Sequence, residues 1–291
     1  MSGRLPHPSE VSPWHDALRR LRRNRLAMAG LALLVLFVTA GFLASWIAPY
    51  PYDKTDLRHG AKPPTFQHLL GTDELGRDLL TRTLYGARIS FAVGILATLV
   101  SLTIGVTYGS LAGYVGGRVD HVMMRIVDIL YGLPFMFFVI LLMVLLGRNI
   151  LNLFIALGAV QWLTMARIVR GQILSLRSRE FVLSAHAMGA SPRRILVRHL
   201  LPNALGPIVV YATLTVPAVM LEEAFLSFLG LGVQPPMASW GSLASEGAAA
   251  MEVYPWLIIF PGCALTVTLL SLNFLGDGLR DALDPQVTAR R

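Results

Sequence analysis

Six long stretches of this chain are apolar and nearly free of charge, and they constrain its fold more than any other feature. They lie near residues 27–48, 89–113, 126–147, 150–167, 204–224 and 252–275. Each has the ~17–25 residues that a helix needs to cross a bilayer. Only 14% of the 291 residues are charged, too few to cover the surface of a soluble protein of this length. The sequence therefore predicts an all-α membrane protein with about six transmembrane helices.

The first apolar run is expected to remain in the mature protein as a membrane anchor. It extends from Leu26 to Ala48, which is longer than the apolar core of a signal peptide. No small-residue cleavage site precedes the aromatic exit at Trp46–Tyr50. We therefore interpret this run as the first span.

The placement of arginines predicts the orientation of the chain. Cytoplasmic loops carry an excess of Lys and Arg, so the net charge of +8 is interpreted as an orientation signal, and nucleic-acid binding is not inferred from it. The arginines expected on one side are Arg4, Arg19, Arg20, Arg22, Arg23, Arg25, Arg118, Arg125, Arg167, Arg170, Arg177, Arg179, Arg193, Arg194, Arg198, Arg280, Arg290 and Arg291. This bias places both termini in the cytoplasm. The predicted outer loop, Pro49 to Arg88, balances its basic residues with acidic ones.

The end of the outer loop has the pattern of an amphipathic helix. From Glu74 to Gly86 the leucines fall near one helical face, which predicts a helix lying at the membrane interface. Asp73 stands where its N-cap is expected. Asp73, Glu74 and Asp78 also suggest a calcium loop, but the spacing required for one is missing.

The predicted cytoplasmic loop between the fourth and fifth spans has the pattern of a helix, a glycine turn and a second helix. Gly189 is expected to end the first helix. Ser191 is the expected N-cap of the second, Pro192 its first residue, and Pro202 its end. An elbow of this kind with small side chains can enter a groove on another protein. An ordinary solvated loop between spans is the alternative.

The same loop resembles the signature loop of ABC importer permeases, in which Glu-Ala-Ala is followed at fixed spacing by Gly, Ile and Leu-Pro. Here Ala185, Gly189 and Leu201-Pro202 match, whereas Leu183, Ser184 and His199 replace the glutamate, the first alanine and the isoleucine. In that family the loop couples the permease to its ATPase. The resemblance therefore implies a coupling role for Ser184, Ala185, Ala187, Gly189, Arg193, Arg194, Leu201 and Pro202.

Other segments resemble one branch of the same family, the permeases for dipeptides, oligopeptides and nickel. They are Gly71–Asp78, Leu226–Gly232 continuing to Gly241, and Gly276–Pro285. The resemblance covers nearly the whole chain and is closest to the second (C) permease of oligopeptide importers. The segments Val122–Arg125, Pro134–Leu141 and Met165–Gln172 support that narrower match.

The resemblance implies a type I ABC importer permease fold in the bacterial inner membrane. Such a permease forms the translocation pathway with a homologous second permease and works with two ATPase subunits and an extracytoplasmic peptide-binding protein. ATP and Mg²⁺ are then bound by the partner ATPases, and this chain needs no cofactor or metal of its own. Dipeptides, nickel and glutathione are the alternative substrates within the family.

Several charged or kinking residues in the spans carry more specific expectations. Glu222 and Glu223 end the fifth predicted span, ~27 Å from Ala204 by helical rise, so both can face water at an outer mouth of the pathway. Trp240 is assigned to the same mouth. Asp128 is expected to pair with Arg125 or Arg118, and Pro134 to kink the third span.

The sequence gives little support to other function classes. Lys54 and Lys62 are the only lysines, and neither completes a phosphate-binding loop, so the chain is not expected to be an ATPase. No histidine lies in a predicted span and no Gly-x-Ser-Gly is present, which disfavours a membrane protease. An ion-driven secondary transporter needs buried ionisable groups or broken helices, and the spans are nearly uncharged. The lone Cys263 excludes an intrachain disulfide.

The predicted domain organisation has four parts. A basic cytoplasmic segment covers residues 1–25, and the first helix with its external loop covers 26–88. The permease domain covers 89–285 and contains the coupling loop 168–203. A cytoplasmic tail covers 286–291.

Overall fold

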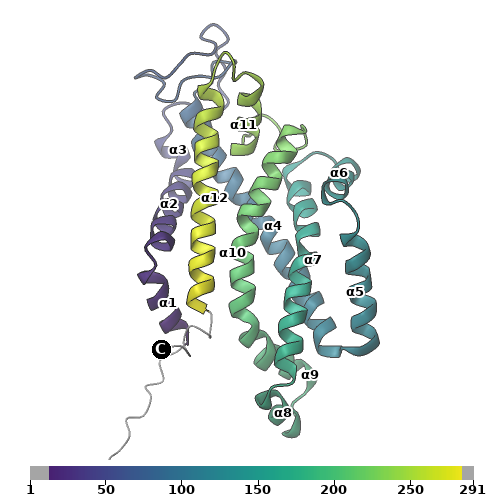
Figure 1. The fold of residues 1–291 in the computed structure, drawn as a ribbon. Helices are drawn as coiled ribbons and strands as arrows, with labels where there is room; N and C mark the ends of the chain where they lie inside the picture. The colour runs from purple at the N-terminus through teal and green to yellow at the C-terminus, as the bar shows by residue number, and fades with distance from the viewer. Residues whose placement is uncertain (1–12, 284–291) are drawn as a thin grey trace, which may run out of the picture.

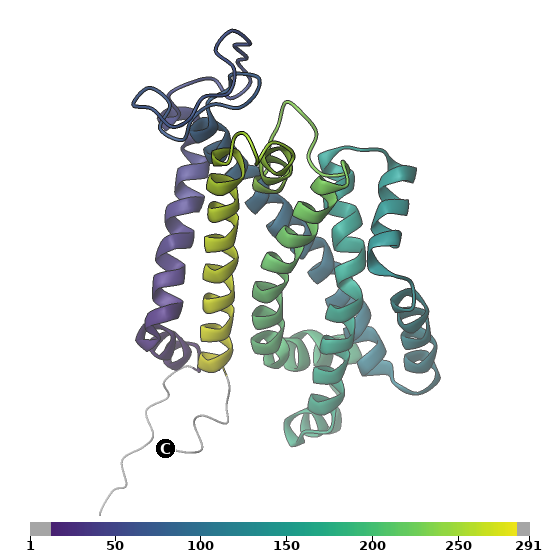
Figure 2. The same cartoon turned by 45° about the horizontal axis from the view of Figure 1, so that its top comes forward.

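The structure of the chain is a computed structural model that describes residues 13–283. Arg4, Arg290 and Arg291 and the predicted tail lie outside this range. The helices follow one another as α1 (Pro13–Arg23), α2 (Arg25–Phe42), α3 (Ala44–Ile47), α4 (Leu79–Val115), α5 (Gly117–Tyr131), α6 (Phe135–Leu146), α7 (Ile150–Arg177), α8 (Glu180–Ala187), α9 (Pro192–Ile195), a π-helical turn η1 (Leu196–Leu200), α10 (Leu201–Phe228), α11 (Trp240–Ala249) and α12 (Trp256–Leu283). The long helices stand side by side in an elongated bundle (Figure 1, Figure 2).

Five helical segments of the described chain are long and apolar enough to cross a membrane. They are α2, α4, α7, the continuous α9–α10 segment and α12, and the bent α5–α6 pair makes a sixth span if it is counted as one. This confirms the prediction of about six spans.

The second span begins earlier than expected and absorbs the predicted amphipathic helix. Helix α4 starts at Leu79, where the side chain of Asp78 accepts a hydrogen bond from the Thr81 backbone N at 2.8 Å. The predicted helix is therefore found only from Leu79 onward, as part of the second span, and its start at Glu74 and its Asp73 cap are wrong. The glycine within that stretch explains why, because Gly76 has a φ of +73°, which a helix does not allow. At 37 residues, α4 is ~55 Å long by helical rise and crosses the bundle at a slant (Figure 1).

The third span is broken at the predicted proline. Helices α5 and α6 meet at an angle of 87° across Gly132–Pro134, because proline disfavours a helical conformation in the preceding residue and has no N–H to donate. The predicted kink is confirmed, and it is large enough to turn α6 nearly perpendicular to α5.

The prediction that Pro202 ends a helix is wrong. Helix α9, the turn η1 and α10 form one continuous helical segment, with Pro202 at the second position of α10. The wider π-helical turn Leu196–Leu200 lies directly before it. A π-turn shifts the hydrogen-bond register, which accommodates a residue that lacks a donor.

Helices α4 and α7 form the central contact of the bundle, because small residues let their backbones approach. Gly105, Gly109 and Gly113 recur every fourth residue on α4, the small-residue spacing of packed membrane helices. A Cβ at Gly109 would collide with the Ala166 carbonyl, and one at Gly113 would lie 2.9 Å from the Arg170 carbonyl. This contact fixes the position of α7, which carries the elbow at its end.

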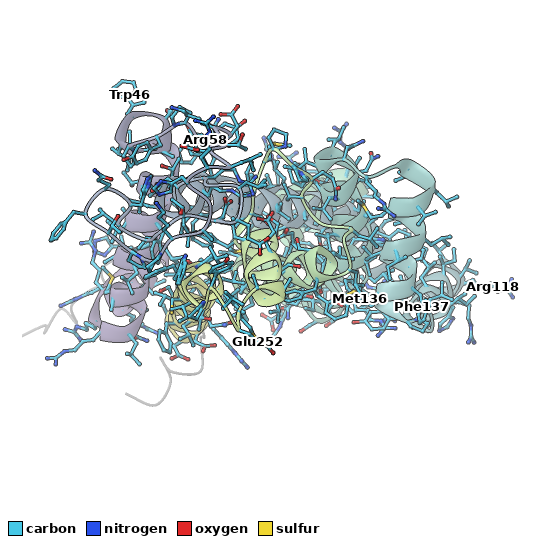
Figure 3. The ribbon with its side chains drawn as sticks, turned by 90° about the horizontal axis from the view of Figure 1, so that it is seen from above. Trp46, Arg58, Arg118, Met136, Phe137 and Glu252 are labelled. Atoms are coloured by element: carbon cyan, nitrogen blue, oxygen red, sulfur yellow. The ribbon has the colours of Figure 1, made fainter. Side chains whose placement is uncertain are left out.

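The two ends of the bundle differ in character. The elbow of α8 and α9 lies at one end, together with α1 and the last turn of α12 (Figure 1). The loop before α4 and helix α11 lie at the other end, called here the outer end. Seen from that end, Trp46 and Phe137 project from opposite edges of the molecule (Figure 3), and they are 87% and 72% exposed. Apolar side chains on these edges suit lipid or another membrane subunit.

Candidate functional site

The turn between α8 and α9 has the geometry that the sequence predicts. Gly189 has a φ of +76°. Its backbone N donates to the His186 carbonyl at 2.9 Å, and the Ala190 N donates to the Ala185 carbonyl at 3.0 Å. This pair of bonds is the Schellman motif, in which the residue after the cap takes a left-handed conformation. Pro192 is the first residue of α9, as predicted, although the Ser191 side chain makes no capping hydrogen bond.

One face of the elbow packs inward and holds it against the bundle. Val182 and Ile195 are fully buried and Ala185 is 2% exposed, and all three pack in one cluster with Ile173 and Leu200. Ala185 therefore packs between α8 and the bundle, and a larger side chain there would push α8 away from the bundle. Of the remaining predicted coupling residues, Leu201 is half-buried, and the exposed ones are Ser184, Ala187, Gly189, Arg193, Arg194 and Pro202.

The opposite face of the elbow exposes apolar side chains that the sequence analysis did not assign. Phe181 is 40% exposed, Leu183 57% and Met188 81%. The sequence signal is that these apolar residues lie between and beside the buried positions Val182 and Ala185. A solvated helix needs no apolar residues on its exposed face. An apolar tip bordered by arginines is the composition of a protein-docking surface.

At the outer end, Glu223 is buried rather than facing water, so the expectation for this carboxylate is wrong. It is 1% exposed, and its Oε1 accepts hydrogen bonds from the hydroxyls of Ser227 at 2.8 Å and Ser239 at 2.7 Å. Ser239 stands at the start of α11, so the carboxylate ties α11 to the end of α10. The two hydrogen-bonded hydroxyls offset the cost of burying the carboxylate. Glu223 therefore holds α11 against the end of α10.

Trp240 is likewise buried, at 1% exposure. Its Nε1 donates to the Thr83 carbonyl at 2.9 Å and its backbone N donates to the Ser90 hydroxyl at 2.9 Å. Phe37 and Phe91 contact the indole edge-on, with ring centroids 5.7 and 5.6 Å away. Trp240 therefore anchors α11 to α4 and presents almost no surface to an outer mouth.

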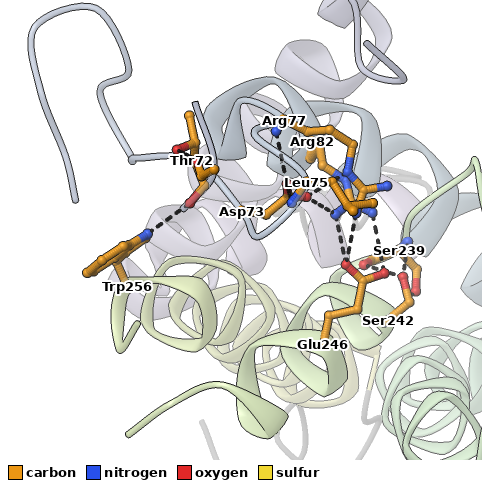
Figure 4. A network of polar contacts seen from close by, with 10 residues as sticks. Thr72, Asp73, Leu75, Arg77, Arg82, Ser239, Ser242, Glu246 and Trp256 are labelled. Carbon is orange, nitrogen blue, oxygen red and sulfur yellow. Dashed lines mark hydrogen bonds and ion pairs between the residues drawn. The ribbon is translucent and has the colours of Figure 1, made fainter. Parts of the chain in front are cut away.

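The segment Gly71–Asp78 binds the start of α4 to α11 through a network of ion pairs (Figure 4). Asp73 Oδ2 accepts bonds from Arg77 Nε and Arg82, each at 2.7 Å, and its Oδ1 accepts from the backbone N of Leu75 and of Arg77. Arg82 also bonds Glu246 of α11 at 2.8 Å. Asp73 is thus an ion-pair partner rather than a helix cap.

Helix α7 holds α5 through two ion pairs. Arg167 donates to Asp128 at 2.7 Å and lies 4.2 Å from the centre of the Tyr131 ring, so the predicted partners of Asp128, Arg125 and Arg118, are wrong. Arg170 donates to Asp120 at 2.6 Å through its second terminal nitrogen, a pair that the sequence analysis missed. The partners are 39 and 50 residues apart, and no local pattern in the sequence connects them.

Glu222 differs from its neighbour because it is only half-buried and lines a cavity. Its Oε1 accepts a hydrogen bond from the side-chain nitrogen of Gln161 on α7 at 2.6 Å. The cavity has a volume of about 420 Å³ and lies beside the break between α5 and α6. Of the three residues assigned to an outer mouth, Glu222 alone lines this cavity.

The fold, with its slanted long helix, broken span and elbow at one end, is that of a solved ABC importer. A solved structure of the MetNI methionine ABC transporter in inward-facing conformations shares it, with a TM-score of 0.59 and 20% identity over 71% of this chain and 96% of that chain. The chain belongs to the family of binding-protein-dependent transport system inner membrane components, whose pattern it matches over residues 105–289. Residues 12–64 match the N-terminal transmembrane domain of oligopeptide transport permease C.

Curated relatives extend over nearly the whole chain. The oligopeptide transport system permease protein OppC of Escherichia coli K12 is 54% identical over 94% of this chain and 92% of its own length. OppC of Haemophilus influenzae is 53% identical over 94% of this chain and 89% of its own length. The chain is therefore an inner membrane protein and a permease subunit of an ABC importer, as the sequence resemblance implies.

Proposed function

We propose that this chain forms, together with a second permease, the translocation pathway of an ATP-driven importer for oligopeptides. The observation that carries the proposal is the elbow, a rigid glycine turn with an apolar tip at the end opposite α11. The match to oligopeptide permeases over nearly the whole chain supports the substrate class. Uptake of labelled peptides by the complete transporter in proteoliposomes tests it, with dipeptides, glutathione and nickel as competing substrates.

The proposed partners are two ATPase subunits, which bind ATP and Mg²⁺, and an extracytoplasmic peptide-binding protein. Phe181, Leu183 and Met188 are proposed to dock in a groove of one ATPase, with Arg193 and Arg194 at its acidic rim. Ser184, Ala187 and Gly189 keep the contact close because their side chains are small, and Ala185, Leu201 and Pro202 hold the elbow in place. Nucleotide drives transport by binding one state of the assembly more tightly than the other.

The purified chain alone is expected to hydrolyse no ATP and to bind no peptide tightly. Neither of its two lysines lies in a phosphate-binding loop, and selectivity is assigned to the binding protein. The measurement is phosphate release by a preparation shown by mass spectrometry to be free of other subunits. ATP hydrolysis by such a preparation contradicts the assignment, and substrate movement without any ATPase favours an ion-driven transporter instead.

Both termini and the elbow are expected in the cytoplasm, and the loop before α4 outside. In a Cys263→Ala background, we expect a membrane-impermeant thiol reagent to label Lys62→Cys in intact cells and to leave Arg118→Cys unlabelled until the cells are lysed. Both positions are exposed and neither is assigned to the ATPase contact, so access depends on the side of the membrane. Because Trp240 is buried, the exposed Glu252 replaces it as a second outer position. Labelling of Arg118→Cys from outside overturns the orientation.

A further inference from the structure

The break between α5 and α6 borders a cavity with one polar and one apolar wall. Its volume of about 420 Å³ is in the range of small-ligand sites. The apolar wall is formed by Leu130, Leu133, Phe135, Phe138, Val160 and Leu163. On the polar wall, the Tyr131 and Thr164 hydroxyls are 2.6 Å apart, and Gln161 bonds Glu222. The rim is open, because Tyr131 and Leu133 are 47% and 48% exposed.

The cavity is lined by one carboxyl group and by no basic side chain of the described residues. Glu222 is the sole charged residue among the described residues that line it. While Oε1 of Glu222 is bonded to Gln161, its Oε2 is buried without a hydrogen-bond partner in the described structure. Ionisable groups at membrane depth are costly and mark substrate pathways by default. The site therefore has room and charge for a cation from outside this chain.

The backbone around the cavity also favours a positively charged ligand. Helix α5 ends at Tyr131, which lines the cavity, and a helix C-terminus carries partial negative charge. Discontinuous membrane helices that end at a cavity are a recurring form of substrate site. Gln161 lies 11 residues past the start of α7 at Ile150, ~16 Å along the helix by its rise, so the site lies well within the length of a candidate membrane span.

We propose that this cavity receives the primary ammonium group at the amino terminus of a peptide in transit, with Glu222 as its counter-charge. The inference rests on the proposed function and adds a contact within the pathway itself. The ammonium has three donors, which suit the carboxylate of Glu222 and the hydroxyl pair of Tyr131 and Thr164. The apolar wall then accommodates the first side chain of the peptide. Every peptide with a free amino terminus offers this group, so the site requires no sequence preference.

The first test is uptake by the complete transporter in proteoliposomes, using a peptide without charged side chains and saturating binding protein. Glu222→Gln removes the charge and keeps the shape, and we expect it to lower uptake about tenfold, since a hydrogen bond to a charged group is lost. Glu222→Asp keeps the charge and should retain most of the uptake. The exposed outer residue Glu252 (Figure 3) supplies the matched control, Glu252→Gln, with unchanged uptake.

The second test asks which end of the peptide occupies the cavity. In a Cys263→Ala background, Leu133→Cys on the rim is oxidised in the presence of peptides that carry cysteine at the first or at the last position. Disulfide trapping is expected with cysteine at the first position, and Glu222→Gln should remove that preference. Preferential trapping by a lysine-containing peptide with an acetylated amino terminus would assign the cavity to side-chain ammonium groups and overturn the proposal.

The outcomes separate this inference from the function on which it rests. If the wild-type complex takes up no peptide, the proposed function is wrong. If it does, and Glu222→Gln transports normally, only the cavity assignment is wrong. If Glu222→Gln loses the second permease on co-purification, Glu222 pairs with that subunit, and the cavity assignment is wrong as well.

Discussion

Gly189→Val is expected to abolish uptake while the protein still reaches the membrane at its normal level. Gly189 has a φ of +76°, a conformation strongly disfavoured for a β-branched residue and costing roughly 1–2 kcal/mol for the backbone of any L-residue. A Cβ at this position meets no atom of the chain within 4 Å. An added Cβ therefore clashes with nothing in this subunit, and a loss of uptake beyond the turn strain is assigned to the docked partner.

A variant series separates the turn from the docking. Asparagine tolerates a positive φ better than most other residues, so Gly189→Asn should keep the turn. The loss of uptake in this variant then measures how much space the ATPase groove leaves for a side chain. Gly171→Ala on α7, where a Cβ is also unopposed, is the control expected to transport normally. The measurements are uptake, co-purification of the ATPase and binding-protein-stimulated hydrolysis. Full transport by Gly189→Val contradicts the coupling role.

The structural features that are predicted correctly are those determined by residues close together in the sequence. The spans follow from run length, the break follows from Pro134, and the turn at Gly189 follows from a glycine after a helical stretch and a proline at the next helix start. Each depends on backbone chemistry within a few residues. Pro202 shows the limit of this reasoning, because the π-turn before it keeps the helix continuous, and no residue type specifies such a turn.

The features missed depend on contacts between distant segments. Glu222 and Glu223 are adjacent in sequence, but one lines a cavity and the other is sealed under Ser227 and Ser239. Their difference arises from where α11 folds back, which helical rise alone does not give. Arg170 was predicted only as a cytoplasmic charge, and its bond to Asp120 follows from the α4–α7 packing that brings α5 alongside.

Arg82→Met is expected to destabilise the outer end strongly. Arg82 is 1% exposed, and it bonds Asp73, whose side chain is 8% exposed, at 2.7 Å. Methionine fills similar space but leaves Asp73 short of one buried counter-charge, and breaking a buried pair from one side costs about 3–5 kcal/mol. Arg77 still contacts Asp73, which places the expected loss at the lower end of that range. Glu246 is 44% exposed, so its own loss of Arg82 adds little.

The double variant Asp73→Asn, Arg82→Met decides whether the buried charge is responsible. Asp73→Asn also takes a partner from Arg77, which keeps Glu246 at 3.5 Å, so the double variant should lose less stability than the two single variants added together, a coupling that a double-mutant cycle measures. Arg88→Met, on the same helix at an exposed position, is the matched control and should change the unfolding free energy little. Denaturant unfolding in detergent is measured for the wild type, Asp73→Asn, Arg82→Met, the double variant and the Arg88→Met control. If Arg82→Met and Arg88→Met are equally mild, the network at Asp73 does not hold α11 to α4, and Glu223 with Trp240 must fix the outer end without it.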